Sequence, residues 1–328
     1  MRESIVFPGP GRVELLTEPV PAAGPGDVVL RTRLTLMSTG TEAMVYAHRF
    51  GANTHWSDWV RYPFRPGYAC VGVVEHAAGD LSVGDRVAAR AQHASRVVVP
   101  ADSCTPIPDG LDDEQAVWFA LAKIAFVGIR EGGVRPGERV LIAGAGPIGQ
   151  MATRWAAAAA ASEIVVVDTV ADRLGLALAG GATATVAGTL DEARDELARQ
   201  FGVRRPDVVI DSTGNPAVLP AALRAAADRG RVVLLGDAGA PTEQRLTSDV
   251  ITRGVSIHGA HDSYTVGDPR WDHDREIARL VFRLAGEGRF PLDSLVSHRF
   301  GPTDSSEAYE LAATARGRTM GIVFDWPQ

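Results

Sequence analysis

The sequence predicts an α/β protein in which a strand-rich part precedes a parallel sheet with alternating helices. Residues 1–118 contain short apolar runs separated by Gly, Pro and Asp, a pattern typical of antiparallel strands joined by tight turns. Residues 119–262 instead alternate helical stretches with apolar strands, as a doubly wound parallel sheet requires. Residues 263–328 form a tail with further helical stretches and a last apolar strand.

Each part has its own expected elements. In the strand-rich part the apolar runs expected to be strands are Asp27–Leu36, Cys70–Glu75, Arg86–Ala89 and Ser95–Val99. A hairpin turn is expected at Pro8–Gly11. In the second part, strands are expected at 139–143, 164–168, 207–211, 231–235 and 255–259. The expected helices include Gln150–Ala161, Leu190–Phe201 and Ala217–Asp228, and the tail adds helices at Arg275–Gly286 and Ser305–Thr314 and a strand at Gly321–Phe324.

The most informative stretch is a glycine-rich turn between the first of these parallel strands and the helix that follows it. Its pattern, G-x-G-x-x-G, is formed by Gly144, Gly146 and Gly149. Gly144 permits the tight turn, Gly146 lets the backbone approach a pyrophosphate, and Gly149 allows the helix to pack closely on the sheet. Pro147 and Ile148 belong to the same turn, and the helix N-terminus offers N–H groups and a positive dipole end to phosphates. The stretch therefore predicts a Rossmann-type dinucleotide-binding unit.

The cofactor expected in this unit is NAD(H). The next strand ends in Asp168, at the distance from the glycine-rich turn where an acid accepts hydrogen bonds from the adenosine ribose hydroxyls. The charge of Asp168 would also repel the 2′-phosphate of NADP(H). Arg173 lies five residues later and suggests a site for the 2′-phosphate of NADP(H). That phosphate, however, would make a buried contact with Asp168, which carries the same negative charge, and such a contact is costly.

Composition excludes several classes of function. The net charge is −7 and no run is rich in Lys and Arg, so no nucleic-acid interface is expected. No apolar stretch approaches the roughly 20 residues of a membrane helix, and no apolar leader follows Met1, so we expect no membrane association and a cytoplasmic location. Cys70 and Cys104 are the only cysteines, too few for a disulfide framework or a four-cysteine zinc site. Lys123 is the only lysine among 33 lysine and arginine residues, which either reflects chance or marks a place that needs a compact, titratable cation.

Further motifs accompany the glycine-rich turn, namely Pro66–Val74, Val83–Val87, Val134–Val140, Asp211–Gly214 and Gly230–Gly236. With them, nearly the whole chain resembles the medium-chain dehydrogenase/reductase superfamily. The resemblance implies a GroES-like catalytic domain built from both chain ends, 1–118 and 263–328, around a Rossmann domain at 119–262. It also implies a homodimer that pairs the last Rossmann strand, near Ser256–Ala260. The cofactor contacts that it adds are Thr213, Gly214, Gly236 and Arg173.

The sequence departs from the zinc enzymes of that superfamily, which carry a cysteine in a C-G-[ST]-[DE] motif and a His-Glu pair after a Pro-Gly. Here Thr39 stands in the cysteine position, Tyr68–Ala69 replaces the His-Glu pair, and the third ligand falls near Phe119. Zinc needs thiolate, imidazole or carboxylate ligands, so the chain resembles a zinc-less branch and no zinc is expected. The alternative is a rebuilt metal site that uses Glu42 and a histidine, either His48 or His93.

The candidates for catalysis are Lys123, Thr41, Tyr68, Glu42 and His261. Lys123 lies one helical turn beyond the third zinc position, and the resemblance places it beside the nicotinamide. It would stabilise the substrate oxygen or exchange its proton; otherwise it pairs with Glu42 or binds a cofactor phosphate. Thr41 has the family's proton-relay position or simply caps a turn, and Tyr68 is a proton donor or a core aromatic. His261, just past the last Rossmann strand, is expected near the nicotinamide end.

The predicted function is that of a zinc-independent, NAD(H)-dependent oxidoreductase that interconverts a secondary alcohol and a ketone. Ser38–Glu42 and Leu295–Phe300 are similar to the bacteriochlorophyllide and sugar or polyol dehydrogenase branches. Arginines and aromatic residues in 48–65 favour a polar or anionic small-molecule substrate. The bias toward Arg, Ala and Gly indicates a GC-rich bacterial genome and specialised metabolism. Two alternatives stay open: an NADPH-dependent enoyl or quinone reductase of the same superfamily, and a non-catalytic cofactor-binding relative.

Overall fold

The computed structural model of the chain describes residues 1–265 and 274–327. The chain divides into two compact units. Unit 1 comprises Met1–Leu121, Pro269–Glu287 and Leu292–Gln328, and unit 2 comprises Ala122–Asp268 and Gly288–Pro291. The larger sheet of unit 1 is mixed and the sheet of unit 2 is parallel, which confirms the predicted α/β fold class.

Unit 2 is built around a six-stranded parallel sheet with the order β10-β9-β8-β11-β12-β13. Its strands are β8 (Arg139–Ala143), β9 (Glu163–Asp168), β10 (Ala184–Ala187), β11 (Val208–Asp211), β12 (Arg231–Leu234) and β13 (Ser256–Gly259). The valines, isoleucines and leucines of β8, β9 and β11 are buried, because helices cover both faces of such a sheet. The strand order reverses between β8 and β11, and ligands of doubly wound sheets bind outside the carboxyl ends of the strands at this switch point.

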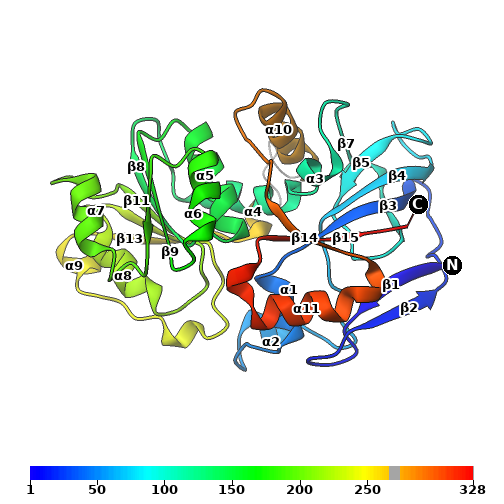
Figure 1. Cartoon of the computed structure of the whole chain (residues 1–328), viewed down its shortest axis with the longest axis horizontal. Coiled ribbons are helices and arrows are strands. Elements are labelled where there is room, and N and C mark those ends of the chain that lie inside the picture. Colours follow the sequence, from blue (N-terminus) through cyan, green and yellow to red (C-terminus); the bar gives the residue numbers. More distant parts are fainter. Residues whose placement is uncertain (266–273, 328) are drawn as a thin grey trace. The chain divides into compact units, whose positions relative to one another are not determined.

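Helices cover both faces of this sheet. They are α4 (Phe119–Glu131), α5 (Pro147–Ala158), α6 (Asp172–Ala179), α7 (Arg194–Phe201), α8 (Val218–Ala225) and α9 (Asp249–Thr252). Figure 1 shows α5 and α6 on one face and α7 and α8 on the other. The second face is filled by an apolar core that includes Leu141, Val209, Phe201 and Leu223.

Unit 1 holds a seven-stranded sheet and a separate two-stranded hairpin. The hairpin pairs β1 (Arg2–Val6) with β2 (Glu14–Glu18), and the sheet contains β3 (Asp27–Met37), β4 (Cys70–His76), β5 (Arg86–Ala89), β6 (Arg96–Pro100), β7 (Thr105–Pro106), β14 (Val296–Phe300) and β15 (Gly321–Asp325). Strand β15 pairs antiparallel with β3, with Ile322 opposite Met37. Both ends of the chain therefore contribute to one sheet, as the resemblance implies.

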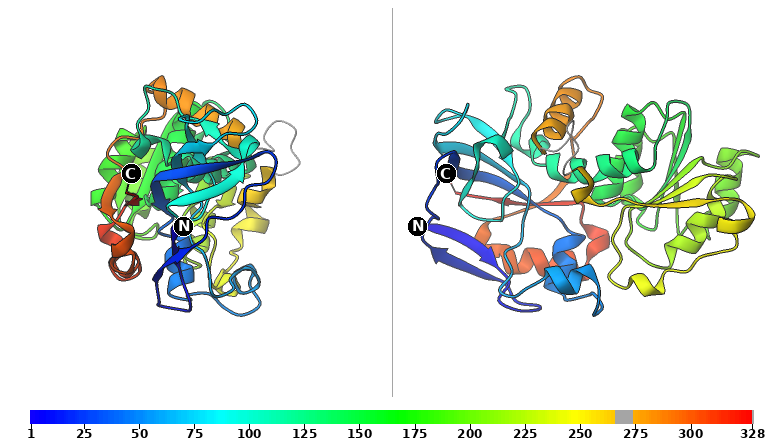
Figure 2. Two further views of the ribbon diagram at one scale, coloured as in Figure 1. Left: turned by 90° about the vertical axis from the view of Figure 1, so that its right-hand side faces the viewer. Right: turned by 180° about the vertical axis from the view of Figure 1, so that it is seen from behind.

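Short helices complete unit 1: α1 (Thr41–Tyr46), α2 (His55–Trp59), α3 (Asp113–Ala116), α10 (Asp274–Gly286) and α11 (Ser305–Thr314). Helix α1 packs against α11, and both views in Figure 2 show the blue and the red-orange helix side by side. Their shared core includes Val45, Tyr46, Tyr309 and Phe324. The buried residues of α1 are Glu42, Ala43, Val45 and Tyr46.

The expected strands of both units are present, with ends that differ by at most one residue. The helix after the glycine-rich turn starts at Pro147 rather than Gln150, because Pro fits the first helical position. Strand β10 was not expected, since Ala184–Ala187 is short and interrupted by threonine. Helix α7 starts at Arg194, four residues later than expected, after a turn in which Glu192 bonds Thr189. Within residues 1–265 and 274–327, no helix is long and apolar enough to cross a membrane.

Candidate active site

The backbone of the glycine-rich turn requires glycine at two of its positions, Gly144 and Gly149. Gly144, directly after β8, has φ +93°, in the left-handed region that favours glycine. A Cβ atom at Gly149 would overlap the carbonyl oxygen of Gly144. Gly146 is extended and caps α5, so the first-turn N–H groups of this 12-residue helix point out of the turn. Pro147 and Ile148 follow as the first residues of α5, and the turn can receive a pyrophosphate.

Asp168 lies at the end of β9 with its side chain 8% exposed, directly beside this turn. Its Oδ2 accepts the N–H of Ala145 at 2.5 Å, and its Oδ1 accepts the N–H of Val170 at 2.7 Å. A guanidinium nitrogen of Arg173 lies 4.0 Å from Oδ2. The carboxylate is thus fixed in place and its negative charge is partly balanced by Arg173. The expected repulsion of a 2′-phosphate assumed that this charge was unbalanced.

The ends of β11 and β12 form the other side of the carboxyl edge. Asp211 is buried and accepts the Thr213 N–H at 2.9 Å and the Thr213 hydroxyl at 2.6 Å. Burial raises the pKa of Asp211 to about 6, although the two bonds from Thr213 act in the opposite direction. Gly214 has φ +66°, and a Cβ at Gly236 would overlap its backbone nitrogen. Thr213, Gly214 and Gly236 therefore share this edge with the glycine-rich turn.

Lys123 lies on α4 with its side chain 7% exposed, and its Nζ is 2.9 Å from Oδ1 of Asp262. Asp262 starts a short 3-10 helix shortly after β13, so it belongs to the same carboxyl edge. His261 is exposed, and its Nδ1 lies 2.8 Å from the Ser263 hydroxyl and 3.2 Å from the Ser263 nitrogen. The backbone N–H of Ser263 makes Nδ1 an acceptor, which leaves the ring proton on Nε2. Asp262, which the sequence analysis did not select, is thus the carboxylate partner of Lys123.

In unit 1, Glu42 is the centre of a buried polar cluster and is 2% exposed. The Tyr309 hydroxyl donates to its Oε2 at 2.6 Å, and the backbone N–H of Ser38 donates to Oε1 at 2.8 Å. Nε2 of His93 lies 2.9 Å from Oε2. Burial raises the pKa of Tyr309 well above its usual value, and the neighbouring Glu42 carboxylate raises it further. Glu42 therefore has a hydrogen-bonded place in the core of unit 1.

Tyr68 joins the same region through hydroxyl groups. Its side chain is half-buried, and the side chains of Ser38 and Thr41 act as hydrogen-bonding neighbours that lower the pKa of its phenol. Burial raises its pKa, and those hydrogen bonds and the Arg90 guanidinium only partly offset this effect. Arg90 stacks over the Tyr68 ring, with its guanidinium carbon 5.0 Å from the ring centroid. A protonated phenol in contact with two hydroxyls can give or pass on a proton at neutral pH.

The arginines of 48–65, expected to favour a polar or anionic substrate, bind groups of their own chain. Arg49 donates to the carbonyl of Ala313 at 3.2 Å. Arg61 donates to the carbonyl of Ser57 at 2.6 Å. Arg65 donates to both carboxylate oxygens of Glu18 at 2.7 Å. The preference for such a substrate stays a prediction.

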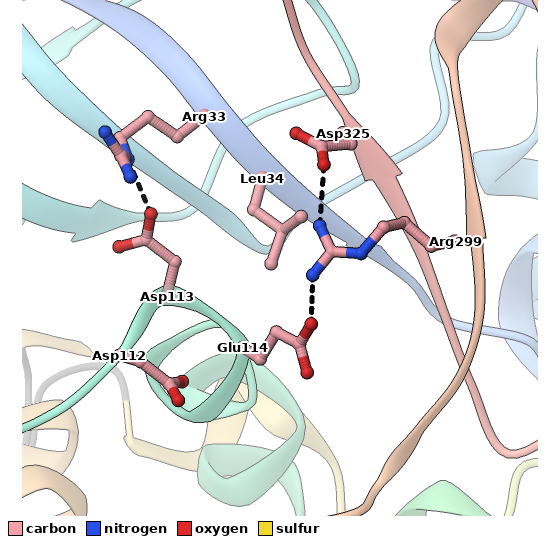
Figure 3. Close-up of a pocket in the computed structure, with 7 residues that line it drawn as sticks. All are labelled: Arg33, Leu34, Asp112, Asp113, Glu114, Arg299 and Asp325. Atoms are coloured by element: carbon pink, nitrogen blue, oxygen red, sulfur yellow. Dashed lines mark hydrogen bonds and ion pairs between the residues drawn. The ribbon is translucent and has the colours of Figure 1, made fainter.

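A separate hollow of about 340 Å³ lies in unit 1 beside α3 and β15 (Figure 3). It is lined by Arg33, Leu34, Asp112, Asp113, Glu114, Arg299 and Asp325. Arg33 bonds Asp113 at 2.5 Å, and Arg299 bonds Asp325 at 2.7 Å and also Glu114. All of these charged residues except Asp112, which accepts the Gln115 N–H, are paired with one another. None of the lining residues is a candidate catalytic residue, so we interpret the hollow as a structural ion-pair network.

Comparison with known proteins identifies the family. The family model described as zinc-binding dehydrogenase matches residues 147–271. An alcohol dehydrogenase of Cupriavidus necator H16 is 26% identical to this chain over 98% of both chains. These matches support membership of the medium-chain dehydrogenase/reductase superfamily and the activity class of a dehydrogenase-type oxidoreductase.

Solved structures of this superfamily member's fold include complexes with both nicotinamide cofactors. A short chain alcohol dehydrogenase of Escherichia coli CFT073 complexed with NADH has a TM-score of 0.81 and 20% identity, covering 99% of both chains. A zinc-binding type dehydrogenase of Sinorhizobium meliloti 1021 bound to NADP has a TM-score of 0.81 and 21% identity, again covering 99% of both. At these identities the likeness shows the fold alone.

The positions that the resemblance assigns to zinc ligands carry side chains of other types in this chain. Thr39 and Phe119 are buried, with a hydroxyl and a benzyl side chain, and Tyr68 offers the hydrogen-bonded phenol. These groups do not fit zinc, which prefers thiolate, imidazole and carboxylate. Glu42 and His93, from the alternative rebuilt site, do meet, whereas His48 lies 3.5 Å from the Tyr62 hydroxyl. Among the described residues no three His, Cys, Asp or Glu side chains form a metal-binding group.

Four residues were not selected as catalytic candidates from the sequence. His93, Tyr309 and Arg90 belong to the polar region of unit 1, and Asp262 belongs to the carboxyl edge of unit 2. None belongs to a local motif, so only the fold could reveal them. Ser38 is different, because it directly precedes the T-G-T-E stretch and could have been selected together with Thr41.

Proposed function

We propose that this superfamily member is a zinc-independent, NAD(H)-dependent oxidoreductase that interconverts a secondary alcohol and a ketone. The observation that carries the proposal is a group of hydroxyls, in which the half-buried Tyr68 takes a zinc-ligand position and has Ser38 and Thr41 as hydrogen-bonding neighbours that lower its pKa. A chain that binds no zinc needs another source of acid–base chemistry and charge at the substrate oxygen. The cluster supplies the first and Lys123 the second.

The carboxyl edge of unit 2 would hold the cofactor. The N–H groups at the start of α5 would bind the pyrophosphate, and Asp168 would bind the adenosine ribose. Gly214 and Gly236 allow backbone segments to approach each other closely at this edge, because a side chain on either would meet backbone atoms. When bound, NAD(H) supplies or accepts the hydride.

The acid–base roles are assigned to side chains of each unit. The Tyr68 hydroxyl exchanges the proton of the substrate oxygen, and Thr41 relays it toward solvent. Because burial raises the pKa of Tyr68, the phenol stays protonated at neutral pH and keeps a hydrogen to donate to the substrate oxygen. Lys123 stabilises the alkoxide-like oxygen or exchanges its proton, Glu42 holds the cluster, and His261 presents its Nε2–H as a second donor.

The setting proposed for this reaction is cytoplasmic bacterial specialised metabolism. The substrate is a polar or anionic small molecule, and the active protein is a homodimer. We propose no nucleic-acid and no membrane partner. A net charge of −7 supports the first of these exclusions.

The test is cofactor binding followed by turnover in protein stripped of metal with a strong chelator. NADH and NADPH are titrated in parallel by nucleotide fluorescence, and a panel of secondary alcohols and ketones is then assayed with the tighter cofactor. We expect NADH to bind at least tenfold more tightly, and added zinc to leave turnover unchanged. Turnover that appears only after zinc is added would refute the zinc-independent chemistry.

Replacement of Lys123 tests its role in the same assay. Lys123→Met is expected to lose NADH-linked turnover by at least a hundredfold while its NADH affinity changes less than threefold. Unchanged turnover would remove Lys123 from the mechanism. A matched loss of binding and turnover would mean that the lysine holds the cofactor instead.

A second candidate is the NADPH-dependent enoyl or quinone reductase. Arg173 favours it, since its guanidinium lies 4.0 Å from Asp168 and weakens the charge argument against a 2′-phosphate. In that case NADPH would bind more tightly than NADH, and Arg173→Gln would abolish the difference. Activity on an unsaturated carbonyl compound, with none on its saturated analogue, would then complete the assignment.

A further inference from the structure

The side chain of Lys123 meets a carboxylate to which the proposed function gives no role. Its Nζ lies 2.9 Å from Oδ1 of Asp262, with the two side chains 7% and 24% exposed. Both belong to unit 2: Lys123 comes from α4, and Asp262 from the 3-10 turn that begins shortly after β13. The pair therefore lies at the carboxyl edge of the sheet, on which Gly144 and Thr213 also lie.

Burial and charge together set the state of this lysine. An ammonium loses its hydration when it is buried, which by itself favours the neutral amine. A carboxylate at hydrogen-bond distance favours the charged form, and its effect is stronger in a site that excludes water. Asp262 reaches Lys123 from a short turn. A hydrogen bond of 3.0 Å from the Tyr264 N–H to the His261 carbonyl fixes the backbone of this turn.

The chemistry of lysine makes this pair different from the other ion pairs of unit 2, which are all formed by arginine in the described residues. A guanidinium stays charged without a partner, whereas an ammonium releases its proton more readily when buried. The carboxylate of Asp262 beside the only lysine therefore favours the charged form of that side chain.

We propose that Asp262 is a positioning residue that keeps Lys123 protonated and fixed at the carboxyl edge, so that Lys123 acts on the substrate oxygen as a constant positive charge. This inference rests on the proposed function and chooses between the two roles open to Lys123 there. In the proposed function the proton of the substrate hydroxyl then passes to the Tyr68 oxygen while Tyr68 gives its own proton to Thr41, and Thr41 releases one proton to solvent, so that each hydroxyl ends neutral. Lys123 gives up no proton in the cycle.

The test uses the fact that Lys123 is the only lysine. An acetylating N-hydroxysuccinimide ester can then modify only Lys123 and the N-terminal amine among the amines, and peptide mass spectrometry separates the two. Only the neutral amine reacts, so the rate reports both the charge and the accessibility of Lys123. The rates are measured from pH 7 to pH 10 in the wild-type protein, Asp262→Asn, Asp262→Glu and a control.

The control is Glu163→Gln, which removes the carboxylate of another ion pair in unit 2, 2.8 Å from Arg139. We expect Asp262→Asn to be acetylated at Lys123 at least tenfold faster than wild type at pH 7, with the ratio falling toward one as the pH rises to 10. For Asp262→Glu we expect the logarithm of the Lys123 acetylation rate at pH 7 to lie at least halfway back from the Asp262→Asn value to the wild-type value. For Glu163→Gln we expect the wild-type rate.

Two results would overturn the inference. Equal rates at pH 7 would show that Asp262 does not set the charge of Lys123. A ratio that stays the same at every pH would show that Asp262→Asn only exposes the side chain. Should Asp262→Asn fail to fold, the same comparison is made between wild type and Asp262→Glu, where an unchanged rate at pH 7 supports the inference and a pH-independent increase contradicts it.

The labelling experiment uses neither cofactor nor substrate, so its failure is distinct from failure of the proposed function. Protein that binds NADH and turns over, yet shows no change of labelling in Asp262→Asn, would lose this inference alone. Once a substrate is found, Asp262→Asn should lower kcat at least tenfold with NADH affinity unchanged within threefold, a split that a loosened fold would not produce.

Discussion

The carboxyl edge of unit 2 and the polar cluster of unit 1 reach their geometry in opposite ways. At the edge the backbone sets the shape, since a Cβ at Gly149 or Gly236 would meet backbone atoms. In the cluster side chains set it, because Glu42 is held by the Tyr309 hydroxyl and lies 2.9 Å from His93. The two regions should therefore fail differently when altered, one by steric displacement and the other by leaving polar groups buried without partners.

The largest effect is expected from the cluster. Glu42→Ala leaves the Tyr309 hydroxyl, the Ser38 N–H and the His93 ring in the core without their acceptor. Breaking such a buried network by removing one charged member costs about 3–5 kcal/mol of the free energy of unfolding. Urea denaturation followed by tryptophan fluorescence measures the loss.

Tyr309→Phe is the matched control, because it removes one hydroxyl and leaves the carboxylate. It should cost about 1–2 kcal/mol, the range for one hydrogen bond to a charged group together with its desolvated partner. Equal costs for Glu42→Ala and Tyr309→Phe would mean that the carboxylate contributes nothing beyond its bond to the tyrosine.

Steric failure is expected at the glycine edge. A Cβ in Gly149→Ala would overlap the carbonyl oxygen of Gly144, so the turn has to move away from α5. We expect a loss of about 3 kcal/mol of stability, the upper end for overpacking, and at least tenfold weaker NADH binding. Calorimetry and a fluorescence titration give the two values.

Gly175→Ala provides the control on the neighbouring helix α6, where a Cβ would find nothing within 4 Å. It should raise stability by about 0.5–1 kcal/mol, because alanine favours the helix interior over glycine. If Gly149→Ala behaved like Gly175→Ala, the close approach of α5 to the turn would have no energetic meaning.

The same contrast explains what could be predicted from the sequence. The glycine-rich turn was predicted from Gly144, Gly146 and Gly149, because the residues that its backbone conformation requires are close together in the sequence. Five of the six strands of unit 2 were also predicted, since burial on both faces leaves continuous apolar runs, whereas β10 is short and only partly buried. Lys123 was noticed through composition, but its partner Asp262 was not, because 139 residues separate them and no local pattern links an acid to a distant lysine.

Only some residues of the unit 1 cluster could be predicted from the sequence. Thr41, Glu42 and Tyr68 were found through their places in two motifs of the superfamily. His93 and Tyr309 complete the site from other elements, and a buried histidine or tyrosine looks like any other in a sequence. Long-range side-chain pairing is decided by packing, which a single sequence does not display.

The two units should also respond to pH in opposite directions, beginning with Asp211 at the sheet edge. Burial raises its pKa from 3.8 to about 6, so the folded state prefers the protonated carboxyl. Its contribution is therefore fully present below pH 3.8 and is lost as the pH rises through 6. The loss amounts to about 2–3 kcal/mol.

Asp211→Asn cannot ionise, so the stability of wild type relative to this variant should fall by that amount between pH 4 and pH 8. Urea denaturation of both proteins across this range measures it. A difference that stays constant, or that grows as the pH rises, would show that the bonds from Thr213 outweigh the effect of burial.

The smallest effect is expected at Glu18, on the hairpin strand β2 of unit 1. Bonds from Arg65, Ser4 and Arg2 lower its pKa from 4.5 to about 2. The folded state prefers the carboxylate, so this contribution is present above pH 4.5 and is lost as the pH falls through 2. Because Glu18 is partly exposed, solvent screening limits the contribution to about 1–2 kcal/mol.

Glu18→Gln should therefore be less stable than wild type at pH 7 and nearly equal to it at pH 2. Glu14→Gln on the same strand is the control, since its partner Arg12 is 67% exposed and the pair should contribute little. Read together with Asp211→Asn, this pair of titrations separates the units: acid should remove stability through the arginine-bound carboxylate of unit 1 and restore it through the buried carboxyl of unit 2. If both variants changed with pH in the same direction, the contrast between a region that pairs its charge and a region that only buries it would not hold.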